Sequence, residues 1–162
     1  MSDYQHIIHP IEPLYNESSR ILLLGSLPSV KSREQNFFYG HPQNRFWPLM
    51  ARLYGREVPR SIEEKKAIAF SCGFALWDVI YSCDIIGSSD ASIRNVIPTD
   101  LGRILAGSSI SAIYCNGRTA AKYYAMYQEK ALGIKAVTLP STSPANAAWD
   151  MDRLEEYWKI IL

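Results

Sequence analysis

The sequence predicts an α/β fold in which helices cover both faces of a central four-stranded parallel sheet, a three-layer α/β/α sandwich. Two observations carry this prediction. Short apolar segments alternate along the chain with longer segments of helical character, and this alternation is typical of parallel sheets whose crossovers are helices. In addition, no linker or internal repeat divides the 162 residues, so we expect a single domain over residues 1–162.

Four apolar segments are the expected strands. The first covers residues 20–25 and is apolar up to the glycine that ends it, as in a strand buried on both faces. The others are expected at residues 74–80, 111–115 and 134–139. Four such strands are enough for the sheet.

Helices are expected between these strands and after the last one. Ser61 and Glu64 have the spacing of a capping box, so a helix should begin after Ser61 and end near Gly73. The remaining expected helices cover residues 44–54, 99–106, 118–130 and 149–161. The long segments between them, residues 26–43 and 81–98, are expected to be loops, and loops of that length are usually functional.

Ligands of parallel sheets bind beyond the carboxyl ends of the strands. This rule selects the segments that follow the four predicted strands, at residues 26–44, 78–84, 116–118 and 140–146. These four segments contain most of the unusual residue clusters of the chain. We therefore expect one functional site, shared by all four.

Residues 36–47 form the most informative cluster. Its aromatic side chains alternate with Gly, Pro and amide residues, which suits a planar polar ligand: a ring stacks on a nucleobase, and amides read its edge. Structural alternatives remain open at this point. Asn44 is also a good helix N-cap, Arg45 can solvate the first helical turn, and His41 before a proline is typical of a turn.

The other strand ends offer complementary groups. Backbone N–H groups in residues 25–29 can meet a ligand carbonyl or form an ordinary turn. Asp78 can accept from a base N–H or bond to the next loop, and Asn116 can enter the pocket or cap a helix. Small hydroxyls on the rigid loop at residues 141–143 suit phosphate contacts, or a capped turn.

Composition excludes several classes of protein. The balance of 17 basic and 16 acidic residues argues against broad coverage of a phosphate backbone, although a local basic patch remains open. Three cysteines without a CxxC pair argue against a disulfide framework, a zinc site or an iron–sulfur cluster. We find neither a membrane-spanning segment nor a signal peptide. The expectation is a cytoplasmic monomer without metal or cofactor, nucleoid-associated in a prokaryote.

Three segments, in the same order along the chain, resemble the motifs of the uracil-DNA glycosylase superfamily. The superfamily motif Gly-x-[Asp/Asn]-Pro-[Tyr/Gly] corresponds to Gly-Ser-Leu-Pro-Ser at residues 25–29. Its mismatch-specific members carry Phe-x-His-Pro-x-Asn-Arg-Phe-Trp, and residues 39–47 read Tyr-Gly-His-Pro-Gln-Asn-Arg-Phe-Trp. The motif [His/Asn]-Pro-Ser is matched loosely by Ser-Thr-Ser at residues 141–143. The chain resembles the hypoxanthine-DNA (deoxyinosine) glycosylase branch most closely.

The resemblance implies a uracil-DNA glycosylase-like fold and a DNA repair enzyme that flips a deaminated base out of DNA. Leu27 stands where the superfamily carries a water-activating Asp or Asn. Relatives in the hypoxanthine branch rely instead on the Asn of the His-Pro-Gln-Asn segment, which implies that Asn44 is the catalytic residue, positioning water or the leaving base. Ser141 stands where the superfamily has a His or Asn that stabilises the departing base.

The remaining residues receive expected roles in this framework. Backbone N–H groups around Ser26 would hold the base carbonyl, a ring would stack on the base, and Asn116 or Asp78 would read its polar edge. The expected base-binding residues are Ser26, Leu27, Phe38, Tyr39, Asp78 and Asn116. The expected DNA contacts are Ser29, Lys31, Arg45, Ser141, Thr142 and Ser143.

The expected partner is DNA that contains deaminated bases, and the expected reaction is hydrolysis of the N-glycosidic bond in base excision repair. Hypoxanthine is the expected base, with uracil or xanthine as further substrates. No nucleophilic Lys lies in the motifs, so no Schiff base is expected. Three alternatives stay open: a mismatch-type uracil-DNA glycosylase, a hydrolase that pairs Ser26 or Ser29 with His41, and a non-catalytic nucleic-acid-binding module.

Overall fold

A four-stranded parallel sheet forms the centre of the computed structural model, which describes residues 3–162. The strands follow the order β3-β2-β6-β7. Their bounds are Phe74–Asp78 for β3, Ile21–Gly25 for β2, Ala112–Asn116 for β6 and Val137–Leu139 for β7. Every residue of β2 and β3 is buried, as predicted for strands covered on both faces.

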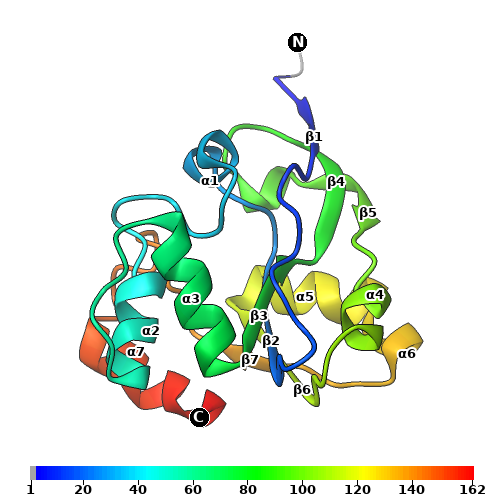
Figure 1. The fold of residues 1–162 in the computed structure, drawn as a ribbon. Helices are drawn as coiled ribbons and strands as arrows, with labels where there is room; N and C mark the ends of the chain where they lie inside the picture. Colours follow the sequence, from blue (N-terminus) through cyan, green and yellow to red (C-terminus); the bar gives the residue numbers. More distant parts are fainter. Residues whose placement is uncertain (1–2) are drawn as a thin grey trace.

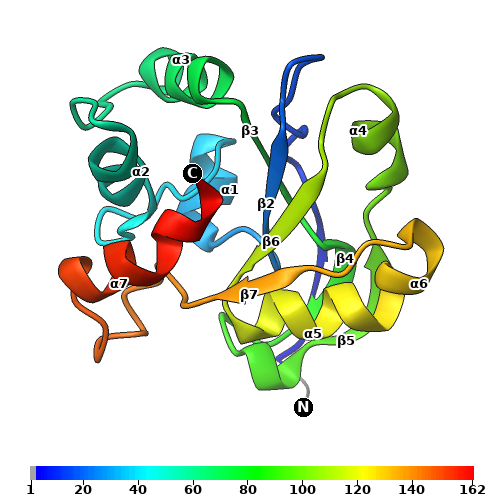
Figure 2. The ribbon, with the colours of Figure 1, turned by 90° about the horizontal axis from the view of Figure 1, so that it is seen from below.

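Helices cover both faces of this sheet, which confirms the predicted three-layer arrangement. Figure 2 shows one group of helices on one face and a second group on the other. The first group consists of α1 (Val30–Gln35), α2 (Phe46–Tyr54), α3 (Ile62–Cys72) and α7 (Met151–Trp158). The second consists of α4 (Gly102–Ala106), α5 (Arg118–Tyr127) and α6 (Glu129–Leu132).

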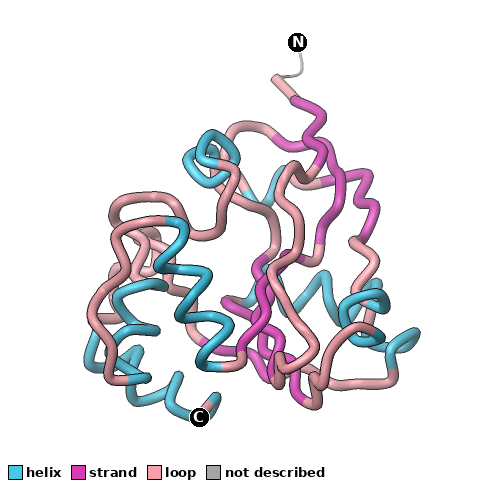
Figure 3. Tube along the Cα trace, in the orientation of Figure 1, coloured by secondary structure: helices cyan, strands magenta, loops and turns pink. Residues whose placement is uncertain are grey.

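A second, antiparallel sheet was not predicted. It has the order β1-β4-β5, with β1 at Gln5–Ile8, β4 at Ile80–Ile85 and β5 at Arg94–Pro98. The expected loop at residues 81–98 is therefore wrong, and a short 3₁₀ helix at Asp90–Ser92 interrupts what remains of it. Only Val79 separates β3 from β4, so the chain passes directly from one sheet into the other (Figures 1 and 3).

The helix ends agree with the predicted caps in one case and differ in another. Ser61 Oγ accepts from the Glu64 N–H at 3.1 Å, and α3 ends at Gly73 with a φ of 80°, as expected. The helix predicted from Asn44 instead begins at Phe46. Asn44 Oδ1 accepts from the Phe46 N–H at 2.9 Å, which forms an Asx turn before the helix.

Other boundaries are also shifted. The predicted helix at residues 118–130 is divided at Gln128 into α5 and α6, and α1 occupies part of the segment 26–43 that was expected to be a loop. The predicted last helix ends in a 3₁₀ turn at Lys159–Ile161. These changes leave the order of the elements intact.

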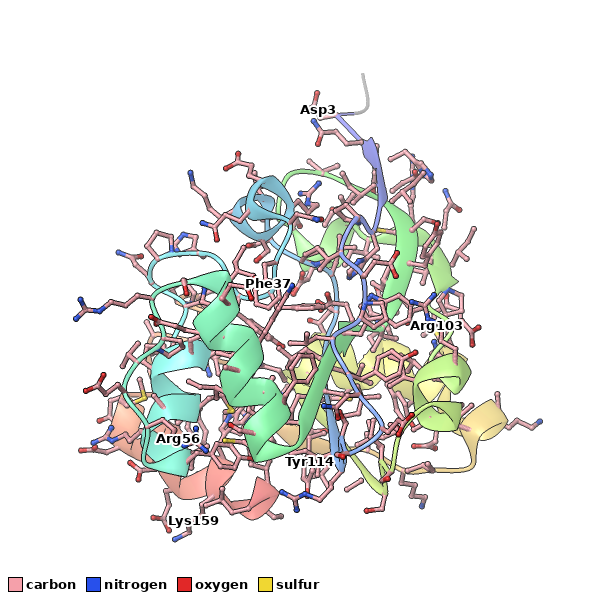
Figure 4. All side chains as sticks on the ribbon, in the orientation of Figure 1. Asp3, Phe37, Arg56, Arg103, Tyr114 and Lys159 are labelled. Carbon is pink, nitrogen blue, oxygen red and sulfur yellow. The ribbon has the colours of Figure 1, made fainter. Side chains whose placement is uncertain are left out.

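The core lies between the sheet and its two helix layers. Phe46, Phe74 and Trp158 pack edge to face and are fully buried, and Phe37 stacks on Trp47. Charged side chains such as Lys159 project at the periphery (Figure 4). Among the helices of residues 3–162, none has the length and hydropathy needed to span a bilayer.

Candidate active site

A cleft of about 910 Å³ lies at the carboxyl ends of the parallel strands. Its walls come from the segment after β2, from Asp78 at the end of β3, from residues 116–119 after β6, and from residues 138–146 around the end of β7. These are the four places that the strand-end rule selects. Loop residues between β4 and the 3₁₀ helix complete the rim.

The cleft brings together all of the predicted site residues except Lys31 and Arg45. Lys31 is exposed on α1, and its Nζ lies 3.5 Å from Glu34 Oε2. The roles assigned to the residues that do line the cleft remain predictions.

Arg45 has a structural task instead of a place in the cleft. Its guanidinium donates to the carbonyl oxygens of Ser143 and Asn146, each at 3.0 Å, and to that of Trp149. These bonds tie the residue before α2 to the loop that follows β7. The arrangement does not favour the predicted phosphate contact, because the planar fork of donors faces backbone carbonyls.

Asp78 is the buried carboxylate of the site. His9 Nε2 donates to Asp78 Oδ2 at 2.7 Å, and the Ile11 N–H donates to His9 Nδ1 at 3.2 Å. Since an N–H can only donate, His9 Nδ1 is the acceptor nitrogen of the ring and Nε2 is the nitrogen that donates to Asp78. Asp78 Oδ1 accepts no hydrogen bond from a described residue and lies toward Gly25 at the cleft floor.

The turn after β2 brings backbone close to this carboxylate. A Cβ on Gly25 would lie 2.3 Å from Asp78 Oδ1, so only glycine allows the approach. Within residues 3–162, neither the Ser26 nor the Leu27 N–H donates to a protein acceptor. These two N–H groups at the cleft are therefore available to a ligand carbonyl.

Asn44, Thr142 and Asn116 form a polar network across the cleft. Thr142, which is fully buried, donates from Oγ1 to Asn44 Oδ1 at 2.9 Å and accepts from Asn116 Nδ2 at 3.0 Å. The Thr142 N–H donates to Asn116 Oδ1 at 3.0 Å. The network joins the start of α2, the end of β6 and the loop after β7.

Tyr39 is the more open of the two rings predicted to stack on a base. Its ring stacks on Phe46 with centroids 4.0 Å apart, so only its other face can receive a base. Phe38 is 2% exposed and packs against Phe37. The Tyr39 hydroxyl is buried and makes no hydrogen bond of normal geometry with a described residue, although the Asn116 amide lies near it. Burial and the nearby Asp78 carboxylate raise the pKa of Tyr39, which keeps the phenol neutral.

The predicted serine contacts also shape their own loops. Ser29 Oγ caps α1 by accepting from the Ser32 N–H at 3.2 Å. Ser141 Oγ accepts from the Ser143 N–H at 3.1 Å, and Ser143 Oγ accepts from the Ala145 N–H at 3.2 Å. Ser141 and Ser143 each keep a hydroxyl hydrogen that can be donated to a ligand at the cleft.

The structure gives no support to a serine hydrolase. His41 Nδ1 accepts from the Gln43 N–H at 3.1 Å, which agrees with the predicted turn role, and neither Ser26 nor Ser29 bonds to His41. Within residues 3–162, no group of three or more His, Cys, Asp or Glu side chains could hold a metal ion.

Sequence reasoning missed three residues at or behind the cleft. Arg33 on α1 and the exposed Arg118 at the start of α5 line it. Arg33 lies in a segment that was expected to be a loop. Arg118 lies in a segment that the strand-end rule selected, but it received no expected role. His9 had no local signal, because only the pairing of β1 with β4 brings it near Asp78.

Comparison with known proteins identifies the family. The model of the uracil DNA glycosylase superfamily matches residues 12–162. The chain belongs to this superfamily. A hypoxanthine DNA glycosylase of Methanosarcina acetivorans is 31% identical over 90% of the chain and 92% of its own length. One of Methanosarcina barkeri is 27% identical over 83% and 85%.

A solved structure supports the same assignment. The NMR structure of a Methanosarcina acetivorans protein, described as a candidate uracil DNA glycosylase, superposes with a TM-score of 0.80. It is 29% identical to the chain, and the match covers 94% of both. This likeness supports a uracil-DNA glycosylase-like fold for the chain.

Proposed function

We propose that this protein is a monofunctional DNA glycosylase that releases deaminated bases from DNA, with hypoxanthine as its main substrate. The observation that carries the proposal is the convergence of the superfamily's motif positions on one cleft that holds a free carboxylate oxygen beside free N–H donors. The names of the two Methanosarcina relatives support hypoxanthine as the base.

The polarity of the cleft suits the edge that deamination creates. Hypoxanthine presents a carbonyl acceptor beside an N–H donor, as uracil does, whereas adenine and cytosine present an amine where the carbonyl stands. Asp78 Oδ1 can accept from the base N–H, and the backbone N–H groups of Ser26 and Leu27 can donate to the carbonyl. An amine in place of the carbonyl would face donors, which disfavours adenine and cytosine.

The reaction is hydrolysis of the bond between C1′ of the deoxyribose and the base nitrogen. The electron pair of that bond leaves with the base, and a water oxygen bonds to C1′. One proton of the water ends on the base, so the products are the free base and an abasic sugar. Because negative charge grows on the base, donors aimed at it accelerate the step, and removing one costs about 3–4 kcal/mol. Asn44 is the side chain we assign to this task.

The decisive experiment is a base-release assay with labelled duplexes that contain inosine, xanthine, uracil or only normal bases. After incubation, heating in alkali cleaves each abasic site. We expect cleavage with inosine, less or none with uracil, and none with normal duplex. No cleavage of any damaged strand would refute the enzyme, and binding to inosine DNA without release would favour a non-catalytic binding module.

Asn44→Ala tests the residue assignment. We expect base release to fall at least a hundredfold. The protein should stay folded, with a moderately lower melting temperature because the Phe46 N–H and the buried Thr142 hydroxyl lose their acceptor. Gln43→Ala is the matched control, because Gln43 is an exposed amide of the same segment outside the cleft. Loss of folding in Asn44→Ala alone would indicate that Asn44 acts mainly through its bond to Phe46.

A further inference from the structure

The hydrogen bonds around Thr142 have only one possible direction. Backbone N–H groups can only donate, so the atom that faces each of them must be an acceptor. The Phe46 N–H faces one amide atom of Asn44 at 2.9 Å, and the Thr142 N–H faces one amide atom of Asn116 at 3.0 Å. Each of these two amide atoms is therefore the oxygen, and the NH₂ group of each side chain lies on the opposite side.

The orientation of the threonine hydroxyl follows from this. Asn116 Nδ2 donates to Thr142 Oγ1 at 3.0 Å, which leaves the hydroxyl hydrogen free to be donated elsewhere. Its acceptor is Asn44 Oδ1 at 2.9 Å. Thr142 is 0% exposed, so water does not compete for this hydrogen bond.

Asn44 consequently has a fully used acceptor oxygen and an unused donor group. Its Oδ1 receives two hydrogen bonds, from Phe46 and from Thr142, which is the number an amide oxygen accepts with good geometry. Its Nδ2 makes no hydrogen bond with any residue in the described part of the chain, and Asn44 lines the cleft.

We propose that Thr142 is a positioning residue that makes Asn44 present only N–H donors to the substrate. This inference rests on the proposed glycosylase function and deepens it. Asn44 then stabilises the negative charge of the departing base, and it does not take a proton from the attacking water, because its oxygen is already occupied. The water loses its proton to solvent after its oxygen has bonded to C1′, and the departing base anion takes up one proton from solvent.

A carboxylate at position 44 distinguishes donation to the departing base from activation of the attacking water. Asn44→Asp keeps the size of the side chain but cannot donate, and its charge repels a base that is becoming anionic. We expect it to be at least as inactive as Asn44→Ala. A water-activating role requires the opposite result, since a carboxylate is the stronger base.

Two substitutions of Thr142 distinguish the effect of its hydroxyl group from the effect of its side-chain volume. Thr142→Ser keeps the hydroxyl, and we expect base release within about threefold of the wild type, less than 1 kcal/mol of barrier. Thr142→Val keeps the volume and removes the hydroxyl, so Asn44 loses the bond that fixes its amide. We expect at least a tenfold lower single-turnover rate, with substrate binding much less affected.

The leaving base supplies the readout that a merely structural role would not change. Single-turnover release is measured for duplexes with hypoxanthine and with 8-azahypoxanthine, whose ring anion is more stable. Donors to the base matter less when the anion is already stable. The losses in Thr142→Val and Asn44→Ala should therefore be clearly smaller with 8-azahypoxanthine. Equal losses with both bases, or activity in Asn44→Asp, would overturn the proposal.

A measurement independent of catalysis distinguishes this inference from the proposed function. The side-chain amide of Asn44 should give a rigid pair of NMR signals in the wild type and in Thr142→Ser, and a mobile pair in Thr142→Val. A rigid amide in Thr142→Val would contradict the positioning role even if the enzyme is active. A wild type that releases no base, with the expected NMR pattern, would refute the function while keeping the orientation.

Discussion

His9 donates from Nε2 to Asp78 Oδ2 over 2.7 Å in the interior of the protein, although 69 positions separate the two residues in the chain. The Ile11 N–H fixes which ring nitrogen carries the proton. Asp78 therefore has one oxygen committed to His9 and one directed to the cleft floor beside Gly25. This division makes the carboxylate a one-sided acceptor for a bound base.

Asp78→Asn should reverse the polarity that Asp78 presents to the cleft. The His9 Nε2–H requires an acceptor, so the new amide would turn its oxygen to His9 and its NH₂ group to the substrate. Replacing an acceptor by a donor opposite the base N–H should lower kcat/KM on inosine DNA at least tenfold, about 1.4 kcal/mol or more. Kinetics with inosine duplexes measure this, and an unchanged kcat/KM would remove Asp78 from base recognition.

Gly25→Ala should damage the site through a steric clash. The added Cβ would lie 2.3 Å from Asp78 Oδ1, and the buried carboxylate has little freedom to move. We expect a loss of about 1–3 kcal/mol in the free energy of unfolding, together with most of the activity. Gly102→Ala is the control, because the nearest atom to its Cβ would be 3.4 Å away. Urea denaturation of both variants gives the comparison.

Arg45→Ala should destabilise the protein as well as inactivate it. The variant leaves three carbonyl oxygens of the loop after β7 without their donor, a loss of about 2–4 kcal/mol in all. Arg45→Lys should rescue little of it, since one ammonium cannot replace the planar fork. If melting temperatures stayed at the wild-type value and only DNA affinity fell, the predicted phosphate contact would be correct after all.

Arg118→Ala should weaken DNA binding in a salt-dependent way. Arg118 is exposed at the cleft and makes no ion pair with a described residue. Loss of one phosphate contact should reduce the slope of log K against log salt by about 1, whether the duplex contains inosine or not. Arg56→Ala removes the same charge away from the cleft. An equal effect of both substitutions would indicate only a general charge effect.

Tyr39→Phe should raise stability while it keeps the stacked ring. The substitution removes a buried hydroxyl that makes no hydrogen bond of normal geometry with a described residue, so the free energy of unfolding should stay equal or increase by up to about 1 kcal/mol. The gain should grow above pH 10. Because the folded pKa lies above the ordinary 10.0, the unfolded chain ionises first, and stability falls as pH rises past that value.

Thermal or urea unfolding at pH 7 and at pH 10.5 checks the Tyr39→Phe prediction. Tyr81→Phe is a suitable control, because the side chain of Tyr81 is 43% exposed. If Tyr39→Phe and Tyr81→Phe lost the same stability between pH 7 and pH 10.5, Tyr39 would not contribute to the loss of stability at high pH.

Those parts of the fold that depend on local sequence patterns could be predicted. The continuous apolar residues of β2 and β3, and the glycines that end β2 and α3, placed the parallel sheet and its helix layers correctly. Topology then brought the residues after these strands into one cleft, because carboxyl ends of parallel strands meet at one edge.

The parts that depend on distant contacts could not be predicted. Most of β5 is exposed and β4 is buried without a regular alternation. Neither strand therefore has the alternating apolar pattern that would have predicted the second sheet. His9 reaches Asp78 only through that sheet. The guanidinium of Arg45 finds its acceptors about a hundred residues farther along, and no local pattern distinguishes that clamp from a phosphate contact.

The strand β1 supports the site from outside the segment that matches the superfamily model, which begins at residue 12. A fragment trimmed to the matched boundary would retain the parallel sheet and every wall of the cleft. It would nevertheless lack the imidazole behind Asp78 and the outer strand that pairs with β4. Expression boundaries chosen by family alignment alone would thus yield a protein with the right architecture and an unsupported carboxylate.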